Sequence, residues 1–389
     1  MRVTTPETII LDGMSIRLGG QVTRIRAYLQ RFRTYDRHSR LIVLEEDGLV
    51  SKEFGDRNDI EFYNRKSSRF AKALTRQAWR NLQLPFLARE WSATVYIHFS
   101  HYLPHGLPRG IKTIVGLANL QPFSPIGIRA EVKLDKLLRL AILKRTIISS
   151  LRRADVVICL SNTCKEALAN AGLIGKKFHV IPNGVDAPLK EDLPDSEIRI
   201  RELEIDRGFL LYVSHFYRYK NFESLVAAYA GLQQSFRDQY QLVLVGVPQH
   251  REYWDSIVAR VRQLGVEEGV RMIPGLGPED LTILYRHCTL FVFPSLVENC
   301  PNILLEAMSC GAPVAASDLP PMPEFGGDAA VYFPPLDVDS IKMTVASLLG
   351  NLELLGTMRQ RSPMQASRFT WDSFTERVVG LYKKAGEDT

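Results

Sequence analysis

The sequence predicts an α/β protein made of two doubly wound domains, each with a parallel sheet. Short apolar runs, each about the length of a buried strand, alternate with longer helical segments along the chain. Strands that are apolar throughout are typical of parallel sheets covered on both faces. The alternation restarts at residue 208, after a proline-containing charged stretch at 187–207. A chain of 389 residues is long enough for two such domains.

The elements of the first half are expected in a regular order. A strand at 7–13 leads into a Gly-Gly turn and a helix. The other strands that we expect are the apolar runs at 40–46, 93–100, 111–119, 154–161 and 177–186. Helical stretches separate these runs, as connections between parallel strands require.

The second half repeats this order. A strand at 208–216 is followed by a helix at 221–236 and a strand at 240–246. The runs GVRMIPG, CTLFVFPS and GAPVAAS continue the series to about residue 317, and 369–385 reads as an amphipathic packing helix. Ligands of such sheets bind beyond the carboxyl ends of the strands, so a cleft between two facing sheets is the expected active site.

Composition narrows the class of protein further. The five cysteines form no Cys-x-x-Cys pair, which favours reduced thiols and a cytoplasmic location. We expect no signal peptide and no transmembrane helix, because no uncharged apolar run reaches 18 residues. Residues 1–190 carry a net charge of +15 and residues 191–389 a net charge of −9. The basic half is therefore expected to meet an anionic partner.

The stretch SLVENCPNILLEAMSCGAPV, residues 295–314, holds Glu298 and Glu306. We expect Glu298 in a loop, Pro301 at the first helical position and Glu306 inside the helix. The start of that helix is suited to binding a diphosphate. Eight helical residues would rise roughly 12 Å, and glycosidase carboxylates lie about 5–10 Å apart. Spacing alone leaves open an acid/base pair, two clamps on one long ligand, or two ordinary glutamates.

Other motifs supply further candidates. Arg218 and Lys220 follow a strand and precede a helix, where cations can neutralise a leaving diphosphate, although a solvated loop pair is the alternative. Gly19 and Gly20 follow the first strand and would let the backbone approach a phosphate or an acceptor. His98, His101 and His105 lack the helix and acidic partner of a metal site, so no metal is expected.

Basic residues also recur at helical spacing. Arg65, Arg69, Lys72, Arg76 and Arg80 would line one face of a helix, and residues 133–153 mix basic with apolar residues. Such helices either lie on an anionic membrane or present a solvated charged face.

Several of these stretches together resemble glycosyltransferase family 4, whose members have the GT-B arrangement of two Rossmann-like domains and retain the anomeric configuration. FVFPSLVENCPNILLEAMSCGAPVAAS resembles the E-x7-E signature of that family. YVSHFYRYKNFESLVAAY resembles its phosphate-binding loop, SIRLGGQVTRI its Gly-Gly loop, and FTWDSFTERVVGLYKK its closing helix. The resemblance covers most of residues 10–385. It implies an acceptor domain at 1–190, completed by helix 369–385, and a donor domain at 191–368.

The resemblance assigns roles to particular residues. Glu298 would contact the donor hexose and Glu306 the ribose hydroxyls, with Lys220 and Arg218 at the diphosphate. We group Glu298, Lys220 and Arg218 as catalytic. The donor-binding set is Gly19, Gly20, Gly275, Ser295, Asn299, Cys300, Asn302 and Glu306. His101 and Asn119 are the acceptor-side candidates, and no cofactor is implied.

The chain departs from the family pattern at two places. Pro301 stands where a glycine is usual and cannot donate a backbone N–H. Ala118 stands where many members have a histidine.

We therefore predict a retaining hexosyltransferase that uses a nucleotide-sugar donor and a glycan or lipid-linked acceptor. Its setting would be polysaccharide or glycolipid assembly. We expect contact with the inner face of an anionic membrane and none with nucleic acid. The alternatives are a nucleotide-sugar epimerase and a non-catalytic basic protein that binds membrane or nucleic acid.

Overall fold

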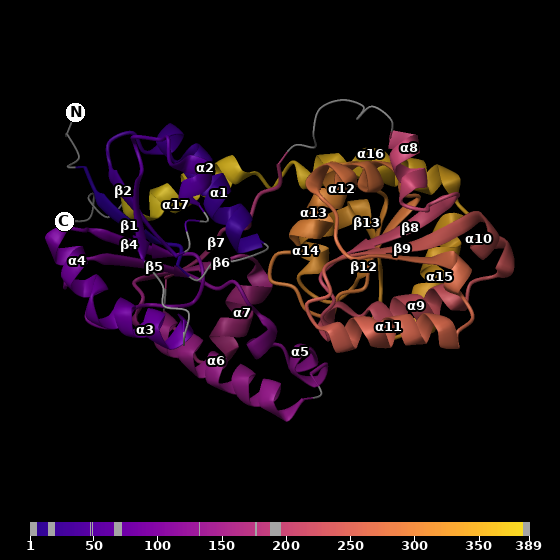
Figure 1. The fold of residues 1–389 in the computed structure, drawn as a ribbon, viewed down its shortest axis with the longest axis horizontal. Coiled ribbons are helices and arrows are strands. Elements are labelled where there is room, and N and C mark those ends of the chain that lie inside the picture. The colour runs from indigo at the N-terminus through magenta and orange to yellow at the C-terminus, as the bar shows by residue number, and fades with distance from the viewer. Residues whose placement is uncertain are drawn as a thin grey trace. The chain divides into compact units, whose positions relative to one another are not determined.

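The computed structural model describes residues 6–14, 20–46, 48, 50–65, 72–131, 133–175, 177–186 and 196–383. The chain forms two compact units (Figure 1). Unit 1 comprises Met1–Phe123, Leu138–Gly184 and Trp371–Thr389, and unit 2 comprises Ser124–Leu137 and Val185–Thr370. The boundary predicted between residues 190 and 191 lies outside the described residues.

Unit 1 contains a seven-stranded parallel sheet in the order β3-β2-β1-β4-β5-β6-β7. Its strands are β1 Thr8–Asp12, β2 Arg40–Glu46, β3 Glu61–Arg65, β4 Val95–His98, β5 Lys112–Gly116, β6 Val156–Cys159 and β7 Lys177–Val180. Strands β4 and β6 are buried along their whole length and β1 is buried after its first residue, which explains their continuous apolar runs. The expected strands are confirmed, whereas β3 was not predicted because EFYNR carries no apolar run.

The helices of unit 1 cover this sheet. They are α1 Gly20–Tyr35, α2 Ser51–Phe54, α3 Lys72–Leu82, α4 Leu84–Glu90, α7 Asn162–Asn170 and α17 Trp371–Lys383, with the short η1 Gln121–Phe123. Helix α6, Leu134–Arg153, begins in residues grouped with unit 2 and continues into unit 1. The C-terminal helix α17 packs against α1, as a packing element should.

Unit 2 contains a six-stranded parallel sheet in the order β10-β9-β8-β11-β12-β13. Its strands are β8 Gly208–Val213, β9 Tyr240–Val245, β10 Val270–Ile273, β11 Leu290–Phe293, β12 Val314–Ser317 and β13 Ala330–Phe333. Strand β13 lies beyond the expected end of the series at residue 317. Both sheets are doubly wound, so the predicted fold class is confirmed.

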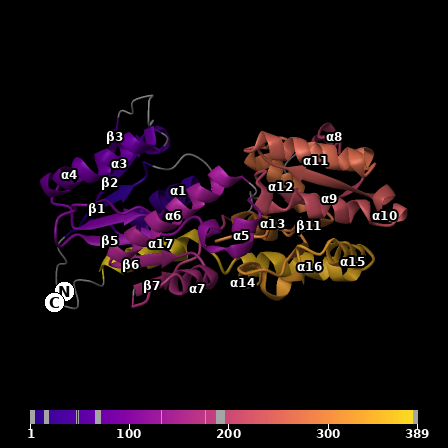
Figure 2. The same ribbon diagram turned by 90° about the horizontal axis from the view of Figure 1, so that it is seen from below.

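The helices of unit 2 lie on both faces of its sheet, with α9 and α11 on one face and α16 on the other (Figure 2). They are α5 Pro125–Arg129, α8 Ser196–Glu202, α9 Phe222–Ala230, α10 Gln234–Gln239, α11 Arg251–Gln263, α12 Pro278–His287, α13 Asn302–Ser309, α14 Met322–Gly326, α15 Val338–Leu349 and α16 Leu352–Ala366. The single-turn helices are η2 Arg218–Lys220, η3 Glu267–Gly269 and η4 Gly327–Ala329. Helix α8 occupies part of the stretch predicted as a linker at 187–207.

Candidate functional site

The carboxyl ends of β8 and β11 bring two predicted motifs together. The two strands are neighbours in the unit 2 sheet and run parallel, so the segments that follow them leave from the same edge. The backbone N–H of Leu296 donates to the carbonyl of Tyr219 at 2.8 Å. This hydrogen bond joins the loop after β11 to η2, which follows β8.

An ion pair joins the two segments at their side chains. The ammonium of Lys220, in η2, lies 2.5 Å from Oε1 of Glu298. Each side chain is 12% exposed, so the pair is only slightly hydrated. The carbonyl of Lys220 also accepts a hydrogen bond from the hydroxyl of Tyr212 at 2.8 Å. Both the backbone carbonyl and the ammonium of the lysine are thus engaged, and the cation lies beyond the carboxyl ends of the strands.

Glu306 lies inside α13, as predicted, and Glu298 lies before that helix. The carboxyl group of Glu306 is partly buried, and no cation among the described residues pairs with it. Burial, and then the negative charge of Asp186, raise the pKa of Glu306 to about 7. A carboxyl group in this state can donate or accept a hydrogen bond near neutral pH.

The start of α13 differs from the prediction in two respects. Pro301 is the residue before the helix, and the first helical position is Asn302. The backbone N–H of Asn302 donates to the carbonyl of Cys300 at 2.9 Å, so this amide is engaged within the loop. The hydroxyl of the buried Ser295 donates to the carbonyl of Val297 at 3.4 Å. Fewer backbone donors are therefore available to a ligand than the motif alone suggests, and Asn299 is buried in the same loop.

Arg218 does not join the pair formed by Lys220 and Glu298. Its guanidinium lies 3.8 Å from Oε1 of Glu223 and 5.3 Å from the ring centre of Tyr253. Both partners belong to helices, α9 and α11, that pack on one face of the sheet. The two cations therefore contact different partners in this structure, and the role of Arg218 at the diphosphate stays a prediction.

The glycines of the donor-binding set belong to different units of the chain. Gly275 follows β10 with a φ of 103°, a conformation suited to glycine. A Cβ there would lie 3.4 Å from Cγ2 of Val247, so the backbone approaches the loop after β9 closely. Gly20 begins α1 in unit 1, whereas Gly275 belongs to unit 2. Gly19 lies outside the described residues.

The acceptor-side candidates lie in unit 1. Nδ1 of His101 is 3.1 Å from the hydroxyl of Ser100, and burial, with the charge of Arg80, lowers the pKa of His101 to about 4. Asn119 follows β5 and accepts a hydrogen bond from the backbone N–H of Gln121 at 2.9 Å. His101 is therefore uncharged at neutral pH and is available as a hydrogen-bonding group.

A buried network at the carboxyl ends of β1 and β4 was not predicted. The guanidinium of Arg80 makes two hydrogen bonds to Asp12, at 2.6 and 2.7 Å, and the hydroxyl of Tyr96 donates to the same carboxylate at 2.7 Å. Burial by itself would raise the pKa of Asp12, but the charge of Arg80 and these bonds bring it down to about 2. Burial lowers the pKa of the adjacent His98 to about 3.

The described part of the chain holds no cluster of three His, Cys, Asp or Glu side chains placed to bind a metal ion. The absence of a metal in the reaction stays a prediction.

The basic residues expected on one helical face are distributed differently. Arg65 ends β3, and both Arg65 and Arg76 pair with Glu46, at 2.5 and 3.0 Å. Arg80 is buried against Asp12. Arg69 lies outside the described residues, as does the side chain of Lys72. Most of the described charge of this predicted face is neutralised inside unit 1, so it is not a free basic surface.

Asn221 links segments around the site through hydrogen bonds, and the sequence analysis did not identify it as a site residue. It adopts the left-handed conformation, with φ 59° and ψ 40°, directly before α9. Its amide nitrogen donates to the carbonyls of Pro294 and Pro335, at 3.2 and 2.7 Å. The only signal in the sequence was an asparagine before a helix, a residue type that tolerates this conformation.

Among the described helices, none combines the length and the apolar character that are needed to cross a bilayer.

Two family models match the chain, one over each half. The model described as "Glycosyltransferase Family 4" matches residues 18–188. The model described as "Glycosyl transferases group 1" matches residues 195–363. Together they cover most of the sequence, including the segments after β8 and β11.

Individual proteins agree with the models. The chain is 27% identical over 316 residues to O-antigen chain mannosyltransferase B of Escherichia coli, covering 79% of this chain and 77% of that protein. It is also 27% identical over 241 residues to the serotype-specific mannosyltransferase WbdA of Escherichia coli, but that match covers 58% of this chain and only 28% of the longer protein.

Solved structures support the fold. Sucrose-phosphate synthase from Thermosynechococcus elongatus matches with a TM-score of 0.76 at 18% identity, covering 98% of this chain and all of that one. HepE from Anabaena, in complex with UDP-glucose, matches with a TM-score of 0.74 at 16% identity, covering 97% and 99%. These matches show a GT-B fold. With both halves matched by the models, the chain belongs to glycosyltransferase family 4.

Proposed function

We propose that the protein transfers a hexose from a nucleotide-sugar donor to a glycan or lipid-linked acceptor, with retention, in bacterial polysaccharide or glycolipid assembly. The observation that carries this proposal is the ion pair of Lys220 with Glu298 beside the start of α13, with Glu306 in that helix. Mannose is the first sugar to test, because the relative matched over most of both chains is a mannosyltransferase. The activities named for the relatives, together with the family, favour this function over that of an epimerase.

The charges of the site suit departure of a nucleoside diphosphate. The bond between the anomeric carbon and the diphosphate oxygen breaks, and negative charge builds on that oxygen. The cation of Lys220 is placed to stabilise this charge, and its partial burial strengthens the interaction. The acceptor hydroxyl oxygen bonds to the anomeric carbon from the same face, and its proton passes to the departing diphosphate oxygen.

The glutamates position the donor in this scheme. Glu298 orients Lys220 and accepts hydrogen bonds from hexose hydroxyls, and Glu306 binds the ribose hydroxyls. Because the acceptor hydroxyl attacks the anomeric carbon directly, the scheme needs no carboxylate nucleophile. Because Lys220 supplies the positive charge, the scheme needs no metal ion.

A donor screen tests the proposal. Purified protein is incubated with GDP-mannose, UDP-glucose and UDP-galactose, with and without bacterial lipid extract, and release of nucleoside diphosphate is measured. We expect release from one donor and weaker binding of that donor by the Glu306→Ala variant. Release from none of them, in either condition, would favour a non-catalytic binding protein, and unchanged donor affinity in the variant would remove the ribose role of Glu306.

We also propose that the protein works in the cytoplasm, at the inner face of an anionic membrane. A lipid-linked acceptor would be presented at that surface. The basic character of residues 1–190 supports this proposal.

A further inference from the structure

Helix α6 leaves an apolar stripe uncovered. Leu134, Leu138 and Ile142 recur every four residues, so they lie along one side of the helix. Their exposed fractions are 82%, 61% and 56%. Ile147 and Leu151, by contrast, are fully buried. Helix α6 therefore has an apolar face that packs on the protein and a second apolar stripe that faces solvent.

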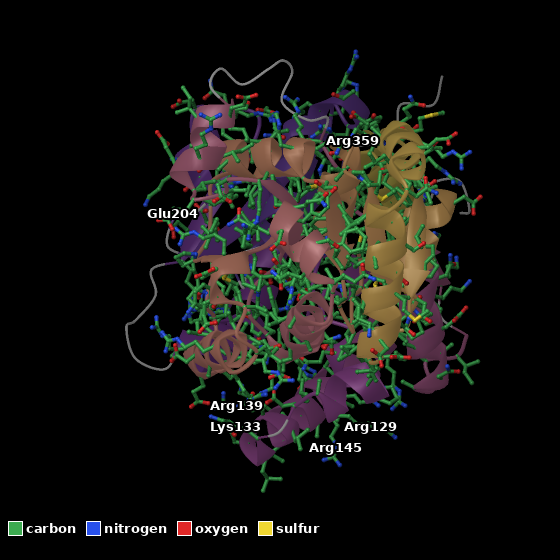
Figure 3. All side chains as sticks on the ribbon, turned by 90° about the vertical axis from the view of Figure 1, so that its right-hand side faces the viewer. Arg129, Lys133, Arg139, Arg145, Glu204 and Arg359 are labelled. Carbon is green, nitrogen blue, oxygen red and sulfur yellow. The ribbon has the colours of Figure 1, made fainter. Side chains whose placement is uncertain are left out.

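Two arginines accompany this stripe, Arg139 at its side and Arg145 one turn beyond Ile142. Arg139 and Arg145 are exposed, and neither makes an ion pair with any described residue. Figure 3 labels both arginines and Lys133, which directly precedes the helix, and shows their side chains extending from this part of the chain. Lys133 differs from them because its ammonium lies 2.5 Å from Glu252. The exposed Asp135, one residue after Leu134, carries the opposite charge on the side of the stripe where Arg139 lies. The outward face of α6 therefore combines the apolar stripe with two arginines and one aspartate.

We propose that this outward face of α6 docks on the surface of an anionic lipid bilayer. An interface of this kind takes aliphatic side chains into the region between headgroups and acyl chains, while guanidinium groups stay with the phosphates. The two arginines without an ion pair among the described residues and the stripe next to them satisfy both requirements at once. The inference deepens the proposed function, because it names the surface that would bring a lipid-linked acceptor to the enzyme.

Other occupants fit this face less well. A nucleic acid would pair with the arginines but would leave the three aliphatic side chains without an apolar partner. A second copy of the chain would set arginines against arginines across the contact, which is unfavourable. A single helix face is also small for a stable protein interface.

The test is co-sedimentation of the full chain with vesicles. Vesicles of phosphatidylglycerol and phosphatidylethanolamine are compared with vesicles of phosphatidylcholine alone. The stripe variant is Leu138→Gln with Ile142→Gln, and its matched control is Ile174→Gln with Leu352→Gln, two aliphatic residues that are 85% and 70% exposed on other elements. The charge variant is Arg139→Gln with Arg145→Gln, and its control is Arg262→Gln with Arg361→Gln, exposed arginines of α11 and α16.

We expect the wild type and both controls to bind the anionic vesicles. The charge variant should partition roughly 25-fold less, at about fivefold for each arginine. The stripe variant should lose about tenfold or more. As a test of insertion, Leu138→Trp should be quenched by brominated lipid, whereas Ile174→Trp should not.

Three results would overturn the inference. They are no binding of the wild type, equal binding by the stripe variant and its control, or self-association that the stripe variant abolishes without any vesicle binding. Release of nucleoside diphosphate from the soluble donor is measured for every variant and should not change. Loss of vesicle binding with donor turnover intact thus separates failure of the docking surface from failure of the proposed function.

Discussion

At the scale of single residues, the ion pair of Lys220 with Glu298 carries the proposed chemistry. Removing the cation in Lys220→Ala withdraws charge stabilisation from the leaving diphosphate. We expect kcat for donor turnover to fall by about 10²–10³, measured by release of nucleoside diphosphate. Glu298→Gln should also reduce kcat, because the carboxylate that orients the lysine is lost.

The pair of Arg199 with Asp280, 2.7 Å apart in the same unit, provides the control. Its side chains are 41% and 22% exposed and it lies outside the predicted site residues, so Asp280→Asn should leave turnover unchanged. A Lys220→Ala enzyme with kcat within about threefold of the wild type would contradict the assigned role.

Glu306 should give the free protein a pH-dependent stability. Its pKa is raised from 4.5 to about 7 in the folded protein. Between these values the folded chain keeps a proton that the unfolded chain has lost, so the free energy of unfolding falls as pH rises. Above pH 7, the ionisation of Glu306 lowers the free energy of unfolding by its full amount, about 3 kcal/mol.

Glu306→Gln removes this ionisation and should flatten the dependence. Urea unfolding of the ligand-free protein at pH 5 and pH 8 measures the effect. The variant should match the wild type at pH 5 and be more stable at pH 8. The stability change of the variant between the two pH values is subtracted from that of the wild type. A difference of zero would show that Glu306 is ionised at both pH values.

At the scale of elements, Asn221 joins the segments after three strands of unit 2. Its amide bonds to Pro294, after β11, and to Pro335, after β13, while its backbone begins α9. Asn221→Gly should lose both hydrogen bonds and leave two buried carbonyls unpaired, at about 1–3 kcal/mol each.

The free energy of unfolding of Asn221→Ala should be about 1–2 kcal/mol lower than that of Asn221→Gly, because alanine is strained in the left-handed conformation. Urea unfolding of the three proteins measures both terms. If the alanine and glycine variants were equally stable, the backbone conformation at this position would not constrain the site.

At the scale of the whole molecule, α17 ties the end of the described chain to its beginning. Trp371 and Tyr382 are buried, and the hydroxyl of Tyr382 donates to Asp36 at 2.8 Å. Arg31, on α1, pairs with Asp372 at 3.1 Å. Unit 1 is therefore completed by a helix that follows the whole of unit 2 in sequence.

A chain that ends at Thr370 should expose the apolar side of α1 and destabilise unit 1. We expect faster amide hydrogen exchange in α1 and little change in β8 and β11. A chain that ends at Lys383 keeps α17 and is the control. Unchanged exchange in α1 without α17 would mean that unit 1 is stable on its own.

The sequence by itself determined that there are two parallel sheets and where most of their strands lie along the chain. Parallel strands buried on both faces need continuous apolar runs, and such runs are visible without any structure. Strand β3 was missed because its residues are only half buried and carry no such run. Pro301 and the apolar run after it likewise placed Glu298 before α13 and Glu306 within it, because helix starts have local signals.

Only the tertiary structure decided which side chains meet. Lys220 and Glu298 are 78 positions apart, and they meet because β8 and β11 are neighbours in the sheet. Arg218, two residues before Lys220, turns instead to Glu223. Arg80, which belonged to an expected surface stripe, is buried against Asp12 from β1. Helical spacing shows which residues share a face, but the partner that covers the face comes from strand order, which brings distant segments together.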